Sequence, residues 1–248
     1  MRRFAQAFID ENAFAPGLPA PIALALASVV QHYNIGKGAT AAVIHAADGG
    51  EPAVSYMAWG LVPRWSKEPS TPYTTVTARL ERAARSRIFA SAWEHRRCVV
   101  PLTGYFKWDR QRKPPWPMFV QRQDGQALLA AGLWEHWEDD AGQQLDSFTM
   151  LTDATRAIPA PLSPDGPVFV SPSTALDWLS GQIESPPQLR SRAERPALEA
   201  YYVGLAVRSP HPDDYTLLEP VDPDVAQTGP AVPWDGDGLD EDADEDAW

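Results

Sequence analysis

The sequence predicts an α+β fold, in which one domain is built on a mixed, curved or closed β-barrel with flanking helices and is followed by a disordered acidic tail. Ten short runs rich in Val, Phe, Tyr or Trp have the length of strands, whereas only three stretches have helical character. The composition, 44% hydrophobic and 22% charged, is that of an ordinary globular protein. The 25 prolines among 248 residues are about twice the usual share, which favours many loops and edge strands.

Most of the strand-like runs span four to eight residues and are bounded by Gly, Pro or Asp. In chain order they are 41–45, 53–58, 97–101, 104–108, 117–122, 127–134, 147–151, 167–170, 201–207 and 215–218.

Three stretches favour helices. Residues 19–33 are apolar and rich in Ala, and residues 78–93 place Leu80, Ala84 and Ile88 at helical spacing. A third helix is predicted at 173–179, because either of two serines at 171 and 173 can cap its first turn.

The negative charge is concentrated at one end of the sequence. The chain has 21 Lys and Arg against 33 Asp and Glu, a net charge of −12, and eight of those acids lie in 235–248, which has no base. Without them 25 acids face 21 bases, a net charge of −4. We therefore expect a single domain over 1–220, a Pro-rich linker over 221–234, and a tail over 235–248 that buries too little apolar surface to fold.

Several classes of protein are excluded or disfavoured. No run of 18 apolar residues is present, and no signal-peptide core follows the first residues, so we expect a cytoplasmic monomer that does not contact membranes. The one cysteine, Cys98, excludes an internal disulfide and a cysteine-based metal cluster. The five histidines lack metal-ligand spacing, so we expect neither a metal nor a cofactor.

Arginine and aromatic residues are interleaved between residues 59 and 108. Six arginines lie in 79–97, and the flanking segments 59–65 and 105–108 supply Trp, Tyr and Phe. Single-stranded nucleic acid needs this combination, because guanidinium groups bind phosphates and rings stack on bases. Composition alone is also consistent with a solvated helix and a tryptophan core, to which we assign Trp59, Trp134 and Trp178.

Six motifs occur in a characteristic order: WGLVPRW at 59–65, ARLE at 78–81, RRCVVPLTGYFKW at 96–108, AGLWEHW at 131–137, FTMLTDA at 148–154 and LDWL at 176–179. Over about residues 1–220 this series resembles the SOS-response-associated peptidase (SRAP) family of abasic-site processing proteins. The resemblance implies a mixed β-barrel with a positively charged channel for single-stranded DNA. It also implies a chemistry in which an N-terminal cysteine crosslinks to the ring-opened aldehyde of an abasic site.

The family's four catalytic positions are nevertheless all substituted. The family begins Met-Cys-Gly-Arg-Phe, and alignment on its Arg-Phe places Met1 where the cysteine stands. Thr77 replaces the Asn of Asn-Ala-Arg-x-Glu, and Lys107 replaces the Glu of Gly-Phe/Tyr-Tyr/Phe-Glu-Trp. Ser163 replaces the His of Ile-His-x-Arg-Met-Pro.

These substitutions predict a pseudoenzyme that binds single-stranded or junction DNA in the DNA damage response. A Met1 thioether cannot close a thiazolidine ring, and Lys107 and Ser163 cannot replace a carboxylate and an imidazole in general acid–base catalysis. One alternative is an active abasic-site enzyme that uses the Met1 or Lys107 amine to form a Schiff base. Another is a protein-interaction module that acts through its acidic tail.

The resemblance also implies which residues bind DNA. Arg79 and Glu81 keep the family's channel positions, and Trp65 occupies the place of a residue near the DNA junction. The predicted DNA-binding residues are Arg2, Trp65, Arg79, Glu81, Lys107 and Trp108. For the tail at 235–248 we consider three roles: docking of a protein partner, competition with DNA for the basic channel, and a solubilising appendage.

Overall fold

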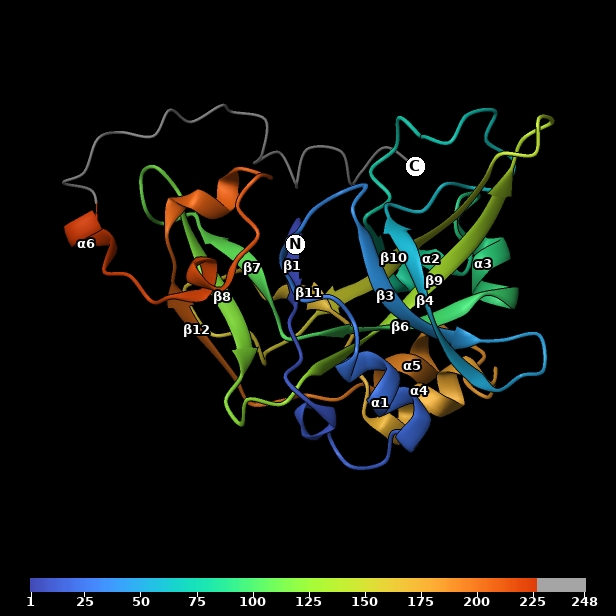
Figure 1. Cartoon of the computed structure of the whole chain (residues 1–248), viewed down its shortest axis with the longest axis horizontal. Coiled ribbons are helices and arrows are strands. Elements are labelled where there is room, and N and C mark those ends of the chain that lie inside the picture. Colours follow the sequence, from blue (N-terminus) through green and yellow to red (C-terminus); the bar gives the residue numbers. More distant parts are fainter. Residues whose placement is uncertain (227–248) are drawn as a thin grey trace.

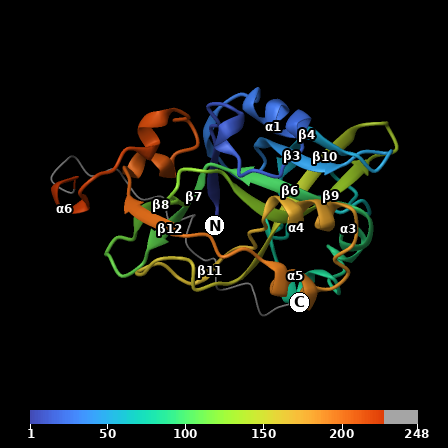
Figure 2. The same ribbon diagram turned by 90° about the horizontal axis from the view of Figure 1, so that it is seen from below.

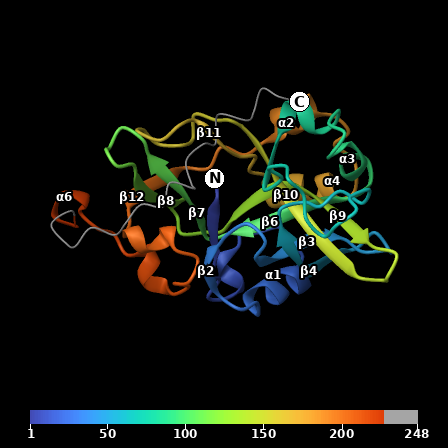
Figure 3. The same cartoon turned by 90° about the horizontal axis from the view of Figure 1, so that it is seen from above.

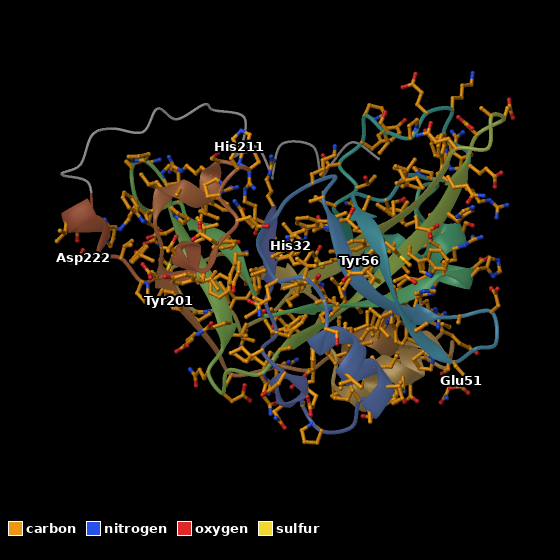
Figure 4. The ribbon with its side chains drawn as sticks, in the orientation of Figure 1. His32, Glu51, Tyr56, Tyr201, His211 and Asp222 are labelled. Carbon is orange, nitrogen blue, oxygen red and sulfur yellow. The ribbon has the colours of Figure 1, made fainter. Side chains whose placement is uncertain are left out.

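The computed structural model describes residues 1–226, whose strands form two sheets (Figure 1). One sheet has five antiparallel strands in the order β12-β8-β7-β1-β2. Their bounds are Arg3–Gln6 for β1, His32–Ile35 for β2, Gly104–Asp109 for β7, Trp116–Arg122 for β8 and Leu198–Tyr202 for β12. Tyr201 on β12 and Tyr56 on β4 mark the two sheets in Figure 4.

The second sheet contains a closed barrel. Its strands follow the order β11-β10-β4-β3-β6-β9, and the additional pairing of β9 with β10 closes a ring of five strands. Because β10 runs parallel to β4 while the other pairs in the ring are antiparallel, the sequence-based expectation of a mixed, closed β-barrel is confirmed. The bounds are Thr40–Ala46 for β3, Pro52–Trp59 for β4, Thr77–Arg79 for β5, Arg97–Leu102 for β6, Leu128–Glu138 for β9, Gln144–Ala154 for β10 and Asp165–Pro167 for β11.

Alternation along the barrel strands divides the core into two layers. On β3, Ala41 and Val43 face the cluster inside the barrel, whereas Ala42 and Ile44 face the cluster beneath the helices. Cys98 is fully buried inside the barrel, and a Cβ at Gly132 would lie 2.9 Å from its Sγ. This position therefore requires glycine because backbone and sulfur approach so closely.

The helices are α1 Ala20–Ala27, α2 Leu80–Ala83, α3 Ala90–His95, α4 Pro172–Leu179, α5 Pro186–Arg192 and α6 Pro223–Ala226. The first five pack around the barrel, whereas α6 lies away from it, beyond the five-stranded sheet (Figure 2). Ser171 is the N-cap of α4, as one of the two predicted alternatives, and its side chain accepts a hydrogen bond from the Thr174 amide. No helix within residues 1–226 is long and apolar enough to cross a membrane.

Two predicted strands near the end of the domain are wrong in whole or part. In the run 201–207 the strand ends at Tyr202, Val203 forms an isolated bridge with Pro220, and Leu205–Arg208 is a 3₁₀-helix. The run 215–218 is also a 3₁₀-helix, because the Asp214 side chain accepts from the Thr216 amide and caps this turn. Local capping therefore overrides the strand preference of the Tyr and Leu residues.

The predicted helices at 19–33 and 78–93 are each shorter or interrupted. The first ends at Ala27, before β2 begins at His32. The second begins with β5 and divides into α2 and α3, between which Ser86 Oγ accepts a hydrogen bond from the Ile88 amide. Such side-chain bonds compete with continuous helix.

Part of the predicted linker packs on the domain. The Val221 amide donates to the Tyr202 carbonyl over 2.9 Å, and Arg112 forms an ion pair with Asp224 at 2.8 Å. The remaining linker residues from 227 and the whole tail at 235–248 lie outside the described residues. The division into domain, linker and tail stays a prediction.

Candidate DNA-binding site

The substituted family positions lie around the seam between the two sheets, where the N-terminus is found (Figures 1 and 3). Strand β1 pairs with β7 so that Arg3 lies opposite Phe106. Continuing this antiparallel register by one residue places Arg2 opposite Lys107. Met1 is half-buried and packs against the barrel interior cluster.

Lys107 is the buried centre of the site. Only 8% of the residue is exposed, and it lies on the same face of β7 as Tyr105, which packs inside the barrel cluster. Its Nζ donates to Ser163 Oγ over 2.9 Å and to the Asp165 carbonyl over 2.5 Å. The structure thus joins two of the four substituted positions, although they are 56 residues apart in sequence.

Arg79 extends this polar network across the barrel edge. Its Nη1 donates to Asp165 Oδ1 over 3.1 Å, and both side chains are partly exposed. Strand β10 holds the pair together, because Thr152 of β10 lies beside Arg79 on one edge and Ala154 lies opposite Asp165 on the other. Thr77 is two residues before Arg79 in β5 and therefore faces the same side of the strand.

Buried polar contacts anchor the strand that carries the first residues. The Gln6 side chain is 1% exposed and bonds both to β3 and to β6. Arg3 donates to the Asn34 side chain and to the Arg208 carbonyl, and its burial lowers the pKa of the guanidinium. Both side chains hold β1 in place, so positions 1 and 2 are set beside β7.

Trp65 is an exposed aromatic residue outside the Lys107 network. It is 48% exposed, and the Arg87 guanidinium lies 5.3 Å from its ring centroid. The carbonyl of the next residue, Ser66, accepts from Trp137 Nε1 over 2.8 Å, which ties this loop to β9. The arrangement offers a ring and a cation on one surface, as stacking on nucleic acid requires.

The remaining predicted residues are placed less uniformly. Glu81 is exposed at the start of α2. Trp108 packs against the cluster that contains Phe106 and Phe119, on the face of β7 opposite to Lys107. Among the tryptophans assigned to the core, Trp59 and Trp178 are fully buried, but Trp134 is only partly buried and lies 5.6 Å from the Arg96 guanidinium carbon.

Asp165 is a site residue that sequence reasoning missed. It stands at the arginine position of Ile-His-x-Arg-Met-Pro, so its carboxylate reverses the charge of that motif. Lys107 stands where the family motif has a glutamate, and Asp165 stands where it has an arginine. The two positions have therefore exchanged the signs of their charges relative to the family pattern. The reversed charges could have been found by comparing the two motifs in the sequence. The contact between Lys107 and Asp165 is visible only in the fold.

No group of three or more His, Cys, Asp or Glu within residues 1–226 is arranged to hold a metal ion. Two of the histidines in this range have polar side-chain neighbours that belong to surface or strand contacts. His136 Nδ1 lies 2.7 Å from Asp146 Oδ1, and His45 Nε2 lies 2.9 Å from Ser55 Oγ.

The fold places this chain among α+β proteins built on a closed, mixed β-barrel. Comparison with known proteins then identifies the family. Residues 5–210 match the SOS response associated peptidase (SRAP) family. The chain belongs to this family, as its motifs predicted.

Individual relatives are distant in sequence. The chain is 26% identical over 176 residues to the abasic site processing protein YoqW of Bacillus subtilis, covering 69% of this chain and 79% of that one. It is 29% identical over 125 residues to the abasic site processing protein YedK of Escherichia coli, covering 50% and 54%. A crystal structure of a protein from Bacteroides thetaiotaomicron superimposes with a TM-score of 0.72 at 20% identity, over 89% of this chain and all of that chain, and shows the same fold.

Proposed function

We propose that this protein binds single-stranded or junction DNA, including abasic sites, in the DNA damage response without forming a thiazolidine crosslink. Family membership and the names of its relatives support a role at abasic DNA. The contact between Lys107 Nζ and Ser163 Oγ carries the rest of the proposal. Where the family motifs have a carboxylate and an imidazole, an ammonium and a hydroxyl meet.

This arrangement favours binding over catalysis. General acid–base catalysis works best with groups whose pKa lies near the operating pH, which a serine hydroxyl does not offer. At the aligned cysteine position Met1 supplies a thioether, which has no proton to lose and cannot add to an imine carbon to close a ring. Lys107 and Arg79 place cations beside the seam, and cations attract phosphates.

The principal alternative is a Schiff-base mechanism at Lys107 or at the N-terminal amine. Burial of Lys107 is a feature it shares with reactive lysines. Its Nζ, however, already donates to the Ser163 hydroxyl and the Asp165 carbonyl. Attack on an aldehyde would require those bonds to break and the ammonium to lose a proton, so we favour the binding role.

One experiment separates these functions. Anisotropy with labelled single-stranded, junction, duplex and abasic oligonucleotides measures binding, and denaturing gels with and without borohydride detect covalent adducts. We expect binding to single-stranded and junction DNA and no adduct in either condition. Lys107→Arg is the matched control, because it keeps the charge but cannot form a stable Schiff base.

Each other outcome contradicts the proposal in a different way. Absence of DNA binding removes it altogether. An adduct without borohydride shows a crosslinking enzyme. An adduct that needs borohydride and disappears in Lys107→Arg assigns the chemistry to Lys107. One that persists in that variant assigns it to another amine, and peptide mapping of the reduced adduct then tells the N-terminal amine from the other lysines.

A further inference from the structure

A cleft beside the Lys107 network has an arginine-rich lining that the proposed site does not use. Its volume is about 330 Å³, and it is lined by residues from the end of β10, strand β11 and the segment that follows α5. Its basic residues are Arg156, Arg190 and Arg195. Its acidic residues are Asp153 and Glu194.

The acids of the cleft are already neutralised by arginines. Arg190 pairs with Asp153, and Arg122 from β8 pairs with Glu194 at 2.8 Å. Within residues 1–226, neither Arg156 nor Arg195 has a hydrogen-bond or ion-pair partner. Two exposed guanidinium groups therefore line the cleft without a compensating anion from this part of the chain.

The cleft is continuous in structure with the Lys107 network. Ala154 pairs with Asp165 at the end of the β10–β11 ribbon, and beyond it the Thr155 amide donates to the Pro164 carbonyl over 2.8 Å. Arg156 follows Thr155 in the loop that joins β10 to β11, and Ser163, the residue that accepts from Lys107, precedes Pro164 at the other end of the same loop. One loop thus carries a residue of each site on its two sides.

From this arrangement we infer that the cleft binds backbone phosphates of a DNA strand. The same strand places its next nucleotide against the Lys107 network. Arginine forks match phosphate oxygens in geometry and charge. The aromatic residue of the lining, Phe169, is only 2% exposed, so the cleft has no ring on which a base could stack. It therefore fits a phosphodiester rather than a nucleobase, and this inference rests on the proposed function.

The test removes the two arginines of the cleft that are unpaired within residues 1–226 and compares the loss of DNA affinity with that caused by removing two cations elsewhere on the surface. The variant is Arg156→Ala/Arg195→Ala, and the control is Arg110→Ala/Lys113→Ala, which removes two charges from exposed positions in the β7–β8 turn. Binding is measured with single strands that carry one abasic residue and are extended stepwise on the 5′ or the 3′ side. Each series is repeated at sodium chloride concentrations from about 0.05 to about 0.5 M, because the slope of affinity against salt concentration reports the number of phosphate contacts.

We expect the cleft variant to bind about 25-fold more weakly at 0.1 M salt, and its salt slope to fall by about 1.4, the value for two single-strand phosphate contacts. The loss should appear only with oligonucleotides extended on one side of the abasic residue. The control variant should show neither the side dependence nor the full change in slope.

Two outcomes would overturn the inference while leaving the proposed function intact. One is an equal loss of DNA affinity in the cleft and control variants, and the other is a loss that does not depend on the length or side of the oligonucleotide extension. If wild type binds no oligonucleotide, the proposed function itself fails. Circular dichroism of both variants establishes that each is folded.

Discussion

Replacement of Gln6 by leucine should destabilise the fold by an amount that the structure allows us to estimate. The Gln6 amide donates to the carbonyls of Ala42 and Pro101 at 2.8 Å each, and its Oε1 accepts from the Ala42 amide at 2.9 Å. Leucine has a similar volume but leaves these three buried backbone groups without that partner. Each lost partner costs roughly 1–3 kcal/mol, and the leucine side chain recovers about 2 kcal/mol by apolar burial. We expect a net loss of about 3 kcal/mol in the free energy of unfolding.

Urea denaturation monitored by tryptophan fluorescence measures this loss, with Gln144→Leu as the control. Gln144 is exposed at the start of β10, so its replacement should change the free energy of unfolding by less than about 0.5 kcal/mol. Amide exchange at Ala42 should also accelerate in the Gln6 variant. A loss below about 1 kcal/mol would refute the reasoning that unpaired backbone groups dominate at this position.

Four further predictions concern binding and charge. Trp65→Ala should weaken single-strand binding by about 1–3 kcal/mol in anisotropy titrations through lost stacking, whereas Tyr215→Ala, at a residue 65% exposed, should not. Asp165→Asn should release Arg79 from its ion pair and tighten DNA binding, with a salt slope larger by about 0.7; weaker binding would contradict this. Deletion of 235–248 should tighten DNA binding, and unchanged affinity would exclude competition by the tail. Arg122 lowers the pKa of Asp124 to about 2, so Asp124→Asn should lower the free energy of unfolding at pH 7, and urea titrations should show that difference shrinking as the pH falls from about 4 toward 2.

Sequence patterns located three of the five barrel strands and two strands of the other sheet well, because these runs are rich in apolar and aromatic residues, whereas β9 and β10 extend beyond the predicted runs 127–134 and 147–151. Strands β3, β4, β6, β7 and β8 agree with the predicted runs to within one residue at each end. Strand β1 escaped prediction because it is four residues long and ends in Gln6, a polar side chain that is buried through three hydrogen bonds. Helix α5 escaped because Pro186 and Pro187 suggest a loop, although proline fits the first turn and Ser185 forms a capping box with Gln188.

The candidate site was predictable only as a set of positions. Motif comparison located Lys107 and Ser163, but nothing local indicates that they are in contact, because β7 and the loop before β11 are brought together by the closure of the fold. Trp108 shows the converse limit. It directly follows Lys107, yet neighbours in a strand face opposite sides, so it belongs to a different cluster.

The buried position of Cys98 makes the protein suited to site-directed labelling. It is the one cysteine in the sequence, it is fully enclosed in the barrel, and burial raises the pKa of its thiol well above the usual range. The thiolate is the form that attacks thiol reagents, so the buried thiol of the native chain should be inert to them. A cysteine introduced on the rim of the arginine-lined cleft would therefore accept a fluorophore at a single place, while modification of Cys98 itself would count only those molecules whose barrel has opened.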